Sequence, residues 1–222
     1  MSIFIKATRS GWYSEFLKPV VDSVSGDPES KRVLDVGTGP GTLPQMLIKQ
    51  NPALRINAID TSRAMIDEAQ RTVSHKNIHF EYQPTNKPLP FARTQFDIVT
   101  FCSVLFLLDE TTKTKLITEA IRVLKPKGKI VILTPSGRKP ILSSFFEVWN
   151  YPFSINNYTF PIWKLATTGG ARRWQRQKWS EKYAGDNQLN YTKSFVFNNN
   201  ATIEIISKHF FNNKSHNNEH KN

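Results

Sequence analysis

The 222-residue chain has a single cysteine, Cys102, and no long hydrophobic run. One cysteine excludes an intrachain disulfide and a four-cysteine zinc site, and no metal site is predicted. No stretch approaches the ~18 apolar residues that a membrane-spanning helix needs. The first residues contain only a short apolar run before Lys6, without the hydrophobic core of a signal peptide. These absences predict a cytoplasmic protein without a transmembrane segment.

Acidic residues are also scarce, because 18 Asp and Glu stand against 30 Lys and Arg, a formal charge of +12. This excess indicates either an anionic partner, such as nucleic acid or a membrane surface, or a basic enzyme. With 39% hydrophobic and 12% aromatic residues, wholesale disorder is excluded. The length suits one large domain, alone or with an elaboration.

The first part of the chain alternates β-rich runs with helical patterns. The helix expected over 62–73 begins after Ser62 as N-cap, and the helix over 110–125 should stop before a turn at Pro126 and Gly128. This alternation predicts a Rossmann-like, doubly wound α/β fold with a mostly parallel sheet. Ligands of such sheets bind beyond the carboxyl ends of the strands. Strands are expected at 31–37, 55–60, 78–83, 96–101 and 129–135, and a further helix at 42–50.

The composition changes near residue 137, and the last 86 residues carry a net charge of +7. A helix is expected over 139–150. The two runs around Asn198–Asn200 predict a β-hairpin, because β-branched residues and Phe dominate them, although helical spacing of Ile203, Ile206 and Phe210 keeps a helix open. The expected organisation is an N-terminal cap helix (1–30), a ligand-binding core (31–136), a cover region (137–190), terminal strands or helix (191–211) and a disordered tail (212–222).

The most informative stretch is VLDVGTGPGTL, residues 33–43. Gly37, Gly39 and Gly41 follow a strand and precede a helix, which lets the backbone approach a ligand closely. Asp60 ends the second strand, where a carboxylate can accept hydrogen bonds from both hydroxyls of a ribose. Asp35 would repel a pyrophosphate but suits a cationic amino group. The pattern therefore indicates a nucleoside with an amino-acid end and no phosphates, a description that fits S-adenosylmethionine.

This stretch resembles motif I of the class I S-adenosylmethionine-dependent methyltransferases. AIDTSRAMIDEA (58–69), the segment 86–109 with its LPF and FDIV, and RVLKPKGKIVILTP (122–135) resemble the family's later blocks in order and spacing. Among its branches, the ubiquinone and menaquinone biosynthesis methyltransferases are the most similar. The resemblance implies S-adenosyl-L-methionine as cofactor, S-adenosyl-L-homocysteine as product and methylation of a small acceptor.

The resemblance also implies roles for individual residues. The family usually has an Asp four residues before the Leu of LPF, and this chain departs from that pattern with Thr85 and Asn86. Cys102 matches no nucleophile context, so a packed thiol is expected there. The positions expected to bind the cofactor are Asp35, Gly37, Thr38, Gly39 and Gly41 in the first block, Asp60, Thr61, Ser62 and Met65 in the second, Thr85 and Asn86 after the third strand, and Phe101 and Cys102 after the fourth, with Ser103 beside them.

The cover region carries the clues to the acceptor. Eight aromatic residues over 141–163 are expected to form an apolar or aromatic pocket, and a helix over 12–20 is expected to cap the cleft. The segment 164–182 interleaves arginines with Trp174 and Trp179, which suits nucleic acid or anionic lipid. An RNA methyltransferase and a non-catalytic adapter therefore remain alternatives. Tyr13, Glu147, Tyr151 and Tyr158 could reach the pocket, but the sequence does not indicate which of them, if any, is a catalytic base. It does not indicate an oligomeric state either.

Overall fold

A computed structural model describes residues 3–26, 31–85 and 87–208. Seven strands form one sheet in the order β3-β2-β1-β4-β5-β7-β6. The first five run parallel, whereas β7 is antiparallel to both β5 and β6. The predicted Rossmann-like α/β fold with a mostly parallel sheet is therefore confirmed.

The elements follow one another with short connections, as the sequence pattern predicts for a doubly wound sheet. In chain order they are α1 (Ile3–Thr8), α2 (Gly11–Ser25), β1 (Arg32–Val36), α3 (Thr42–Gln50), β2 (Arg55–Asp60), α4 (Arg63–Thr72), β3 (Ile78–Tyr82), β4 (Phe96–Cys102), η1 (Leu105–Leu107), α5 (Glu110–Val123), β5 (Leu124–Pro135), η2 (Ile141–Ser143), α6 (Ser144–Glu147), η3 (Val148–Asn150), η4 (Ile155–Tyr158), α7 (Thr159–Gln177), α8 (Trp179–Asp186), β6 (Leu189–Val196) and β7 (Ala201–Lys208).

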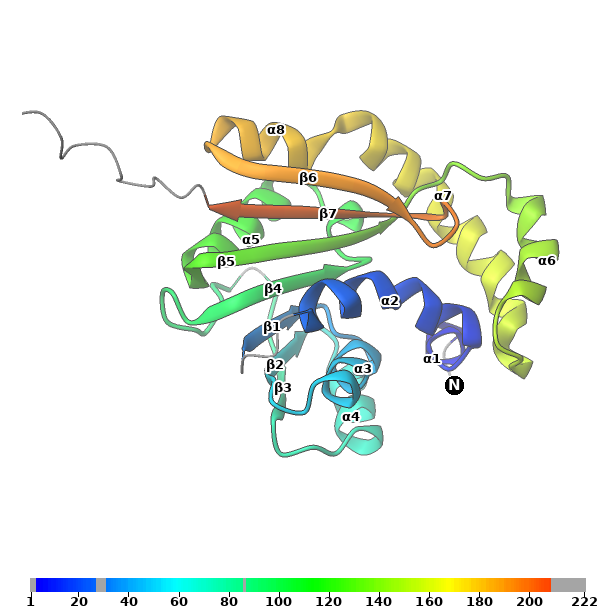
Figure 1. Cartoon of the computed structure of the whole chain (residues 1–222), viewed down its shortest axis with the longest axis horizontal. Helices are drawn as coiled ribbons and strands as arrows, with labels where there is room; N and C mark the ends of the chain where they lie inside the picture. Colours follow the sequence, from blue (N-terminus) through cyan, green and yellow to red (C-terminus); the bar gives the residue numbers. More distant parts are fainter. Residues whose placement is uncertain (1–2, 27–30, 86, 209–222) are drawn as a thin grey trace, which may run out of the picture.

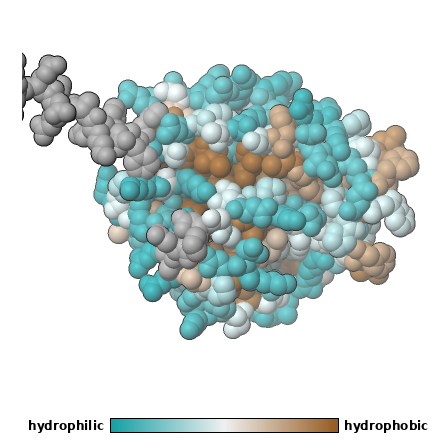
Figure 2. Space-filling view, in the orientation of Figure 1, coloured by the Kyte–Doolittle hydropathy of each residue, from teal (hydrophilic) through white to brown (hydrophobic). Residues whose placement is uncertain are grey.

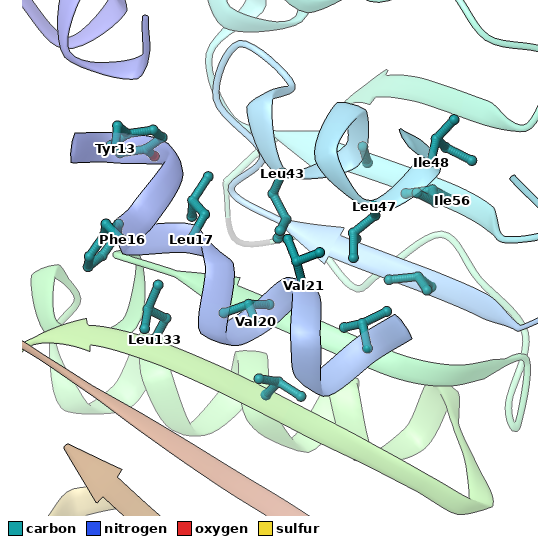
Figure 3. Packing of buried hydrophobic residues seen from close by; sticks show 14 of the residues in the cluster. Tyr13, Phe16, Leu17, Val20, Val21, Leu43, Leu47, Ile48, Ile56 and Leu133 are labelled. Carbon is teal, nitrogen blue, oxygen red and sulfur yellow. The ribbon is translucent and has the colours of Figure 1, made fainter. Parts of the chain in front are cut away.

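Two apolar layers cover the two faces of the sheet. Helices α2, α3 and α4 pack on one face, and α5, the end of α7 and α8 pack on the other (Figure 1). On the first face, side chains of α2 point toward those of α3 and the strands, as Figure 3 shows for Phe16, Leu17, Val20, Val21, Leu43 and Leu47. The central strands β1 and β4 are thus largely buried, and the carboxyl edge of the sheet is where polar groups can meet a ligand.

The connection from α5 to β5 differs from the expected turn. Helix α5 ends at Val123, and β5 begins at once with Leu124 and continues through Pro126 and Gly128. Leu124 pairs with Phe96, and Lys129 pairs with Ile98. These partners are two residues apart on β4 but five apart on β5, so β5 contains extra residues between them. Such a bulge leaves residues outside the hydrogen-bond ladder, which explains why a proline is tolerated inside this strand.

The second part of the chain combines a broken helical run with the hairpin. The helix expected over 139–150 is present only as η2, α6 and η3 in succession. The hairpin is confirmed in β6 and β7, whose turn holds Asn198 and Asn199 with positive φ. The helix alternative for this segment is wrong, because β7 completes the sheet beside β5. The expected tail, 212–222, lies outside the described residues, as do 209–211.

No helix of the described ranges has the length and apolar character needed to cross a bilayer. The cytoplasmic location stays a prediction.

Candidate functional site

The carboxyl ends of β1, β2 and β4 lie side by side and bring the two predicted acids to one edge of the sheet. Asp35 lies one residue before the end of β1 and is in register with Thr100 of β4. Asp60 is the last residue of β2. The glycine loop begins directly after β1, and the main-chain N–H groups of Gly37 and Thr38 both donate to Ile59 O, at 2.8 and 3.0 Å.

Asp60 ties the glycine loop to the start of α4. One carboxylate oxygen accepts from Gly39 N and the other from Ser62 N, each at 2.8 Å. Ser62 occupies the N-cap position of α4 as predicted, but its side chain makes no cap hydrogen bond. A carboxylate offers about four acceptor positions, so both oxygens of the half-buried Asp60 can still accept from a ligand.

A cavity of about 480 Å³ opens against Asp60. Its size is that of a small-molecule or cofactor pocket. Gly37, Thr61 and Thr85 also line it, so with Asp60 four of the predicted cofactor residues line the same cavity. The other walls come from the loop after β3, from the segment after β4 and from α5, with Gln83, Leu89, Val104, Leu108, Leu116 and Glu119 among them.

Asp35 does not line this cavity. It is buried near the carboxyl end of β1, with only 2% of its surface exposed. Thr100 Oγ1 donates to Asp35 Oδ1 at 2.6 Å. Burial raises the pKa of Asp35 to about 6, against the opposing effect of the Thr100 and Thr38 hydroxyls, and the negative charge of Asp60 adds to the rise. A cationic group placed beside Asp35 would favour its ionised form.

Tyr13 of α2 is the one earlier candidate base that reaches this corner. Burial raises its pKa far above the usual range, and the nearby Cys102 and Asp35 add to the rise. A phenol that holds its proton at neutral pH can donate a hydrogen bond but is a poor general base. Burial likewise raises the pKa of Cys102, which packs at the edge of the apolar core. The expectation of a packed thiol is therefore confirmed.

The other three candidate bases lie elsewhere. Glu147 is buried in α6 and forms an ion pair with Lys164 of α7. Tyr151 packs against Phe160 and Phe197 in the core, and Tyr158 is exposed. None of them lines the cavity beside Asp60.

The predicted aromatic acceptor pocket is wrong in its simple form, because the eight aromatic residues split into two sets. Tyr151, Phe160 and Trp163 point inward and join the core with residues of α2. The other five are exposed, and the structure brings none of the eight to the cavity beside Asp60. Sequence alone misled here because a run of aromatic residues does not reveal which side chains face outward. The exposed five are Phe145, Phe146, Trp149, Phe153 and Tyr158.

The expected stacking surface over 164–182 is also wrong. Trp174 and Trp179 are buried, and Trp174 Nε1 donates to Glu204 of β7 at 2.9 Å. Neither ring is free to stack on a base. The arginines of this segment, Arg172, Arg173 and Arg176, remain on the surface.

The remaining predicted residues that the structure describes do not line the cavity. Thr38, Gly39 and Gly41 form the loop behind Gly37, and Met65 lies half-buried on α4. Phe101 is buried in β4, and Asn86 lies outside the described residues. Ser103 takes a positive φ after β4, and its buried hydroxyl has no hydrogen-bond partner among the described residues. Their roles in binding stay predictions.

Gln83 and Glu119 are among the cavity residues that the sequence did not predict. Gln83 follows β3, and its Nε2 donates to Pro88 O at 3.0 Å, which holds the loop over the cavity. Glu119 of α5 accepts from Leu89 N at 3.0 Å and is paired with Arg122. Gln83 could have been found, because it follows a strand at the carboxyl edge. Glu119 carried no such signal, since its position depends on how α5 packs.

Comparisons with known proteins agree with this geometry. The profile of the family described as "Methyltransferase domain" matches residues 33–128. The ubiquinone/menaquinone biosynthesis C-methyltransferase of Desulfotalea psychrophila is 33% identical over 126 residues, which cover 56% of this chain and 50% of that protein. The demethylmenaquinone methyltransferase of Thermotoga maritima is 31% identical over 146 residues, covering 63% of this chain and 61% of that protein. This chain thus spans about half to three fifths of the length of these curated relatives.

The fold has close counterparts among solved structures. The crystal structure of a SAM dependent methyltransferase from Aquifex aeolicus aligns with a TM-score of 0.60 at 18% identity, covering 93% of this chain and 97% of that chain. The part of the chain that matches the family model builds most of the parallel sheet and its glycine loop, so residues 33–128 are similar to a methyltransferase domain.

Proposed function

We propose that this protein transfers a methyl group from S-adenosylmethionine to a small apolar or aromatic acceptor. The observation that carries the proposal is Asp60, which fixes the glycine loop and at the same time faces the cavity of about 480 Å³. This is the position from which a carboxylate accepts hydrogen bonds from the hydroxyls of a ribose.

The residues present suit S-adenosylmethionine from end to end. Asp60 and Thr61 would hold the ribose, and Thr85 would contact the adenine through a neutral hydroxyl. Asp35, buried beyond the glycine loop, suits the cationic amino group of the methionine end. The unpartnered Ser103 hydroxyl lies after β4, where the family resemblance places the transferable methyl.

When bound, S-adenosylmethionine would supply a methyl group on a sulfonium: the acceptor's nucleophile would bond to the methyl carbon, and the electron pair of the broken S–CH3 bond would stay on sulfur. The protein's contribution is to hold donor and acceptor together, which is worth up to ~10⁵–10⁸ M in effective molarity. Neither Tyr13 nor Cys102 would serve as a general base at neutral pH, because burial raises the pKa of both groups.

The acceptor is proposed to be small and apolar or aromatic, and a demethylated quinol is the first compound to test. One curated relative is named a ubiquinone/menaquinone biosynthesis C-methyltransferase, and another is named a demethylmenaquinone methyltransferase. The rings of Phe4 and Trp12 both contact the Tyr13 ring edge-on, so aromatic side chains gather around Tyr13, which supports an acceptor of this kind.

Calorimetric titration with S-adenosylmethionine tests the proposal. Replacing Asp60 by Ala removes the carboxylate that is proposed to accept hydrogen bonds from the two ribose hydroxyls. The substitution should weaken binding by about 100-fold or more. Asp67→Ala removes an exposed carboxylate from the adjoining helix and should leave the affinity unchanged. If the unaltered protein does not bind the cofactor at all, the enzyme proposal fails and a non-catalytic adapter replaces it.

An RNA acceptor is disfavoured by the burial of Trp174 and Trp179, which removes the stacking groups that the sequence offered. Transfer of labelled methyl from S-adenosylmethionine to a demethylated quinol or to total RNA separates the two acceptors. Labelled quinol supports the proposal, and labelled RNA with unlabelled quinol overturns its acceptor class.

A further inference from the structure

The cover region presents a surface of exposed apolar side chains. In the helical run 141–150, Leu142, Phe145, Phe146 and Trp149 are all exposed and stand at the spacing i, i+3, i+4, i+7, so they share one face. Phe153 and Ile155 follow, with exposed fractions of 95% and 84%, and Ile162 and Leu165 continue the set on α7. We call these eight exposed residues the apolar patch: Leu142, Phe145, Phe146, Trp149, Phe153, Ile155, Ile162 and Leu165.

The charges of this segment are turned inward instead. Between Pro140 and Ala166 the only charged residues are Glu147 and Lys164, and both are buried. Their side chains lie 3.7 Å apart, and Lys164 Nζ also donates to Ser143 Oγ at 3.1 Å. Asn200 donates to Glu147 Oε2 at 2.6 Å. An ordinary surface helix has the opposite arrangement, with charges outside and apolar residues inside.

Exposed large apolar side chains gathered on one part of a protein mark sites of interaction. Figure 2 shows apolar side chains at the edge of the molecule where Figure 1 places α6 and α7. Large aromatic and aliphatic side chains such as Trp149 and Phe153 are the groups that enter the boundary between lipid headgroups and acyl chains.

The charge distribution along α7 identifies the chemistry of the partner. The exposed positions of α7 form one stripe, which is apolar at Ile162 and Leu165 and basic at Arg173 and Arg176. The helix contains no acidic residue. An anionic lipid bilayer complements both parts at once, since its acyl region takes apolar groups and its phosphates take arginines.

The patch also continues toward the cofactor site. Helix α1 packs beside α7 and η4, and its Ile3 and Phe4 are exposed. The Phe4 ring lies so close to the glycine loop that a Cβ on Gly39 would be 3.2 Å from Phe4 Cε1. The apolar surface therefore extends from the outer edge of the cover region to the loop that is proposed to bind the cofactor.

From these observations we infer that the apolar patch docks this protein on an anionic membrane surface, with Trp149 and Phe153 inserted and Arg173 and Arg176 on the lipid phosphates. The inference does not depend on catalysis, and it commits to lipid as the occupant. A second copy of the chain and nucleic acid are the competing occupants, and the experiment separates them.

Trp149 is a built-in reporter, because it is 83% exposed whereas Trp12, Trp174 and Trp179 are buried. Vesicles of phosphatidylcholine containing phosphatidylglycerol should shift the tryptophan emission of the full chain to the blue, and brominated acyl chains should quench it. Trp149→Phe keeps an apolar side chain there and should abolish most of both signals while vesicle binding persists. An unshifted emission with no co-flotation of the unaltered protein would overturn the inference.

Flotation with variants then tests each half of the surface. Trp149→Ser with Phe153→Ser should lower the vesicle-bound ratio about ten-fold or more, since each removes an aromatic side chain that the bilayer would bury. Arg173→Gln with Arg176→Gln should lower it about ten-fold on anionic vesicles and abolish its salt dependence. Leu107→Ser, which replaces an exposed apolar residue outside the patch, should leave vesicle binding unchanged.

Two further results would overturn the inference in favour of the competitors. Sedimentation without lipid that shows a dimer, dissolved by Trp149→Ser with Phe153→Ser, would assign the patch to a second copy. Single-stranded RNA that binds through Arg173 and Arg176, is unaffected by the patch variant and competes away all vesicle binding would assign the surface to nucleic acid. Circular dichroism melting of each variant excludes loss of fold as the cause.

Discussion

The core and the cover region of this protein place their charges in opposite ways. In the core, Asp60 lies at the open end of a strand and faces a cavity, while apolar side chains fill both faces of the sheet. In the cover region, Glu147 and Lys164 are buried against each other and Phe146, Trp149 and Phe153 face outward. The comparison teaches that a site for a polar ligand and a surface for an apolar partner require inverted patterns on neighbouring parts of one chain.

The two regions are joined through α2, and this junction provides the largest expected effect. Trp12 is fully buried, its Nε1 donates to Thr159 Oγ1 at 3.0 Å, and its ring packs on Phe160 and Trp163. Trp12→Ala should lower the free energy of unfolding by about 3–5 kcal/mol, measured by chemical denaturation. Trp12→Phe keeps much of the packing and should lose less. A loss below ~1 kcal/mol for the alanine variant would show that core and cover region are held together elsewhere.

The buried pair of the cover region should come next in size. Lys164→Met leaves Glu147 with fewer partners inside the protein and should lower the free energy of unfolding by about 2–4 kcal/mol. The double variant Glu147→Leu with Lys164→Met replaces both charges by apolar groups and should recover at least half of that loss. If the double variant is as unstable as the single one, the inward charges are not what costs stability in this region.

Asp35 offers the corresponding test in the core. Its pKa of about 6 lies above the value of an exposed Asp, so the folded state favours the neutral form. The stability that this carboxyl contributes is therefore present at low pH and lost as the pH rises through about 6. Asp35→Asn should raise the free energy of unfolding by about 1–3 kcal/mol at pH 7.5 and change it little at pH 4. Denaturation curves at the two pH values measure this, and a variant that is destabilised at both would contradict it.

The titration of Asp35 should also affect cofactor binding, but here the ionised form is the favourable one. A cationic amino group needs the ionised form of Asp35, so the affinity for S-adenosylmethionine should fall about ten-fold between pH 7.5 and pH 5. Asp35→Asn should bind weakly at both pH values and lose most of this dependence. Calorimetry at the two pH values checks it, and an equal pH slope in the variant would remove Asp35 from the methionine end.

Local patterns predicted the core well and the cover region poorly, for physical reasons. The glycines, Asp60 and the strands are specified by residues close in sequence, so their places could be read before the fold was known. The burial of Trp174 depends on Glu204, thirty residues away, and the inward direction of Phe160 depends on Trp12 of α2. The bulge at Pro126 likewise depends on the pairing of Leu124 with Phe96 on another strand.

Phe153 gives the smallest expected effect and the sharpest contrast within the cover region. With an exposed fraction of 95%, its ring is as hydrated in the folded state as in the unfolded chain, so Phe153→Ser should change the free energy of unfolding by less than ~0.5 kcal/mol. Phe160→Ser, seven residues later and fully buried, should lower it by several kcal/mol, because it opens a cavity and buries a hydroxyl there. Chemical denaturation of the pair measures the difference. If Phe153→Ser were as costly as Phe160→Ser, the ring would be packed in solution, and the outward apolar patch would not exist in the free protein.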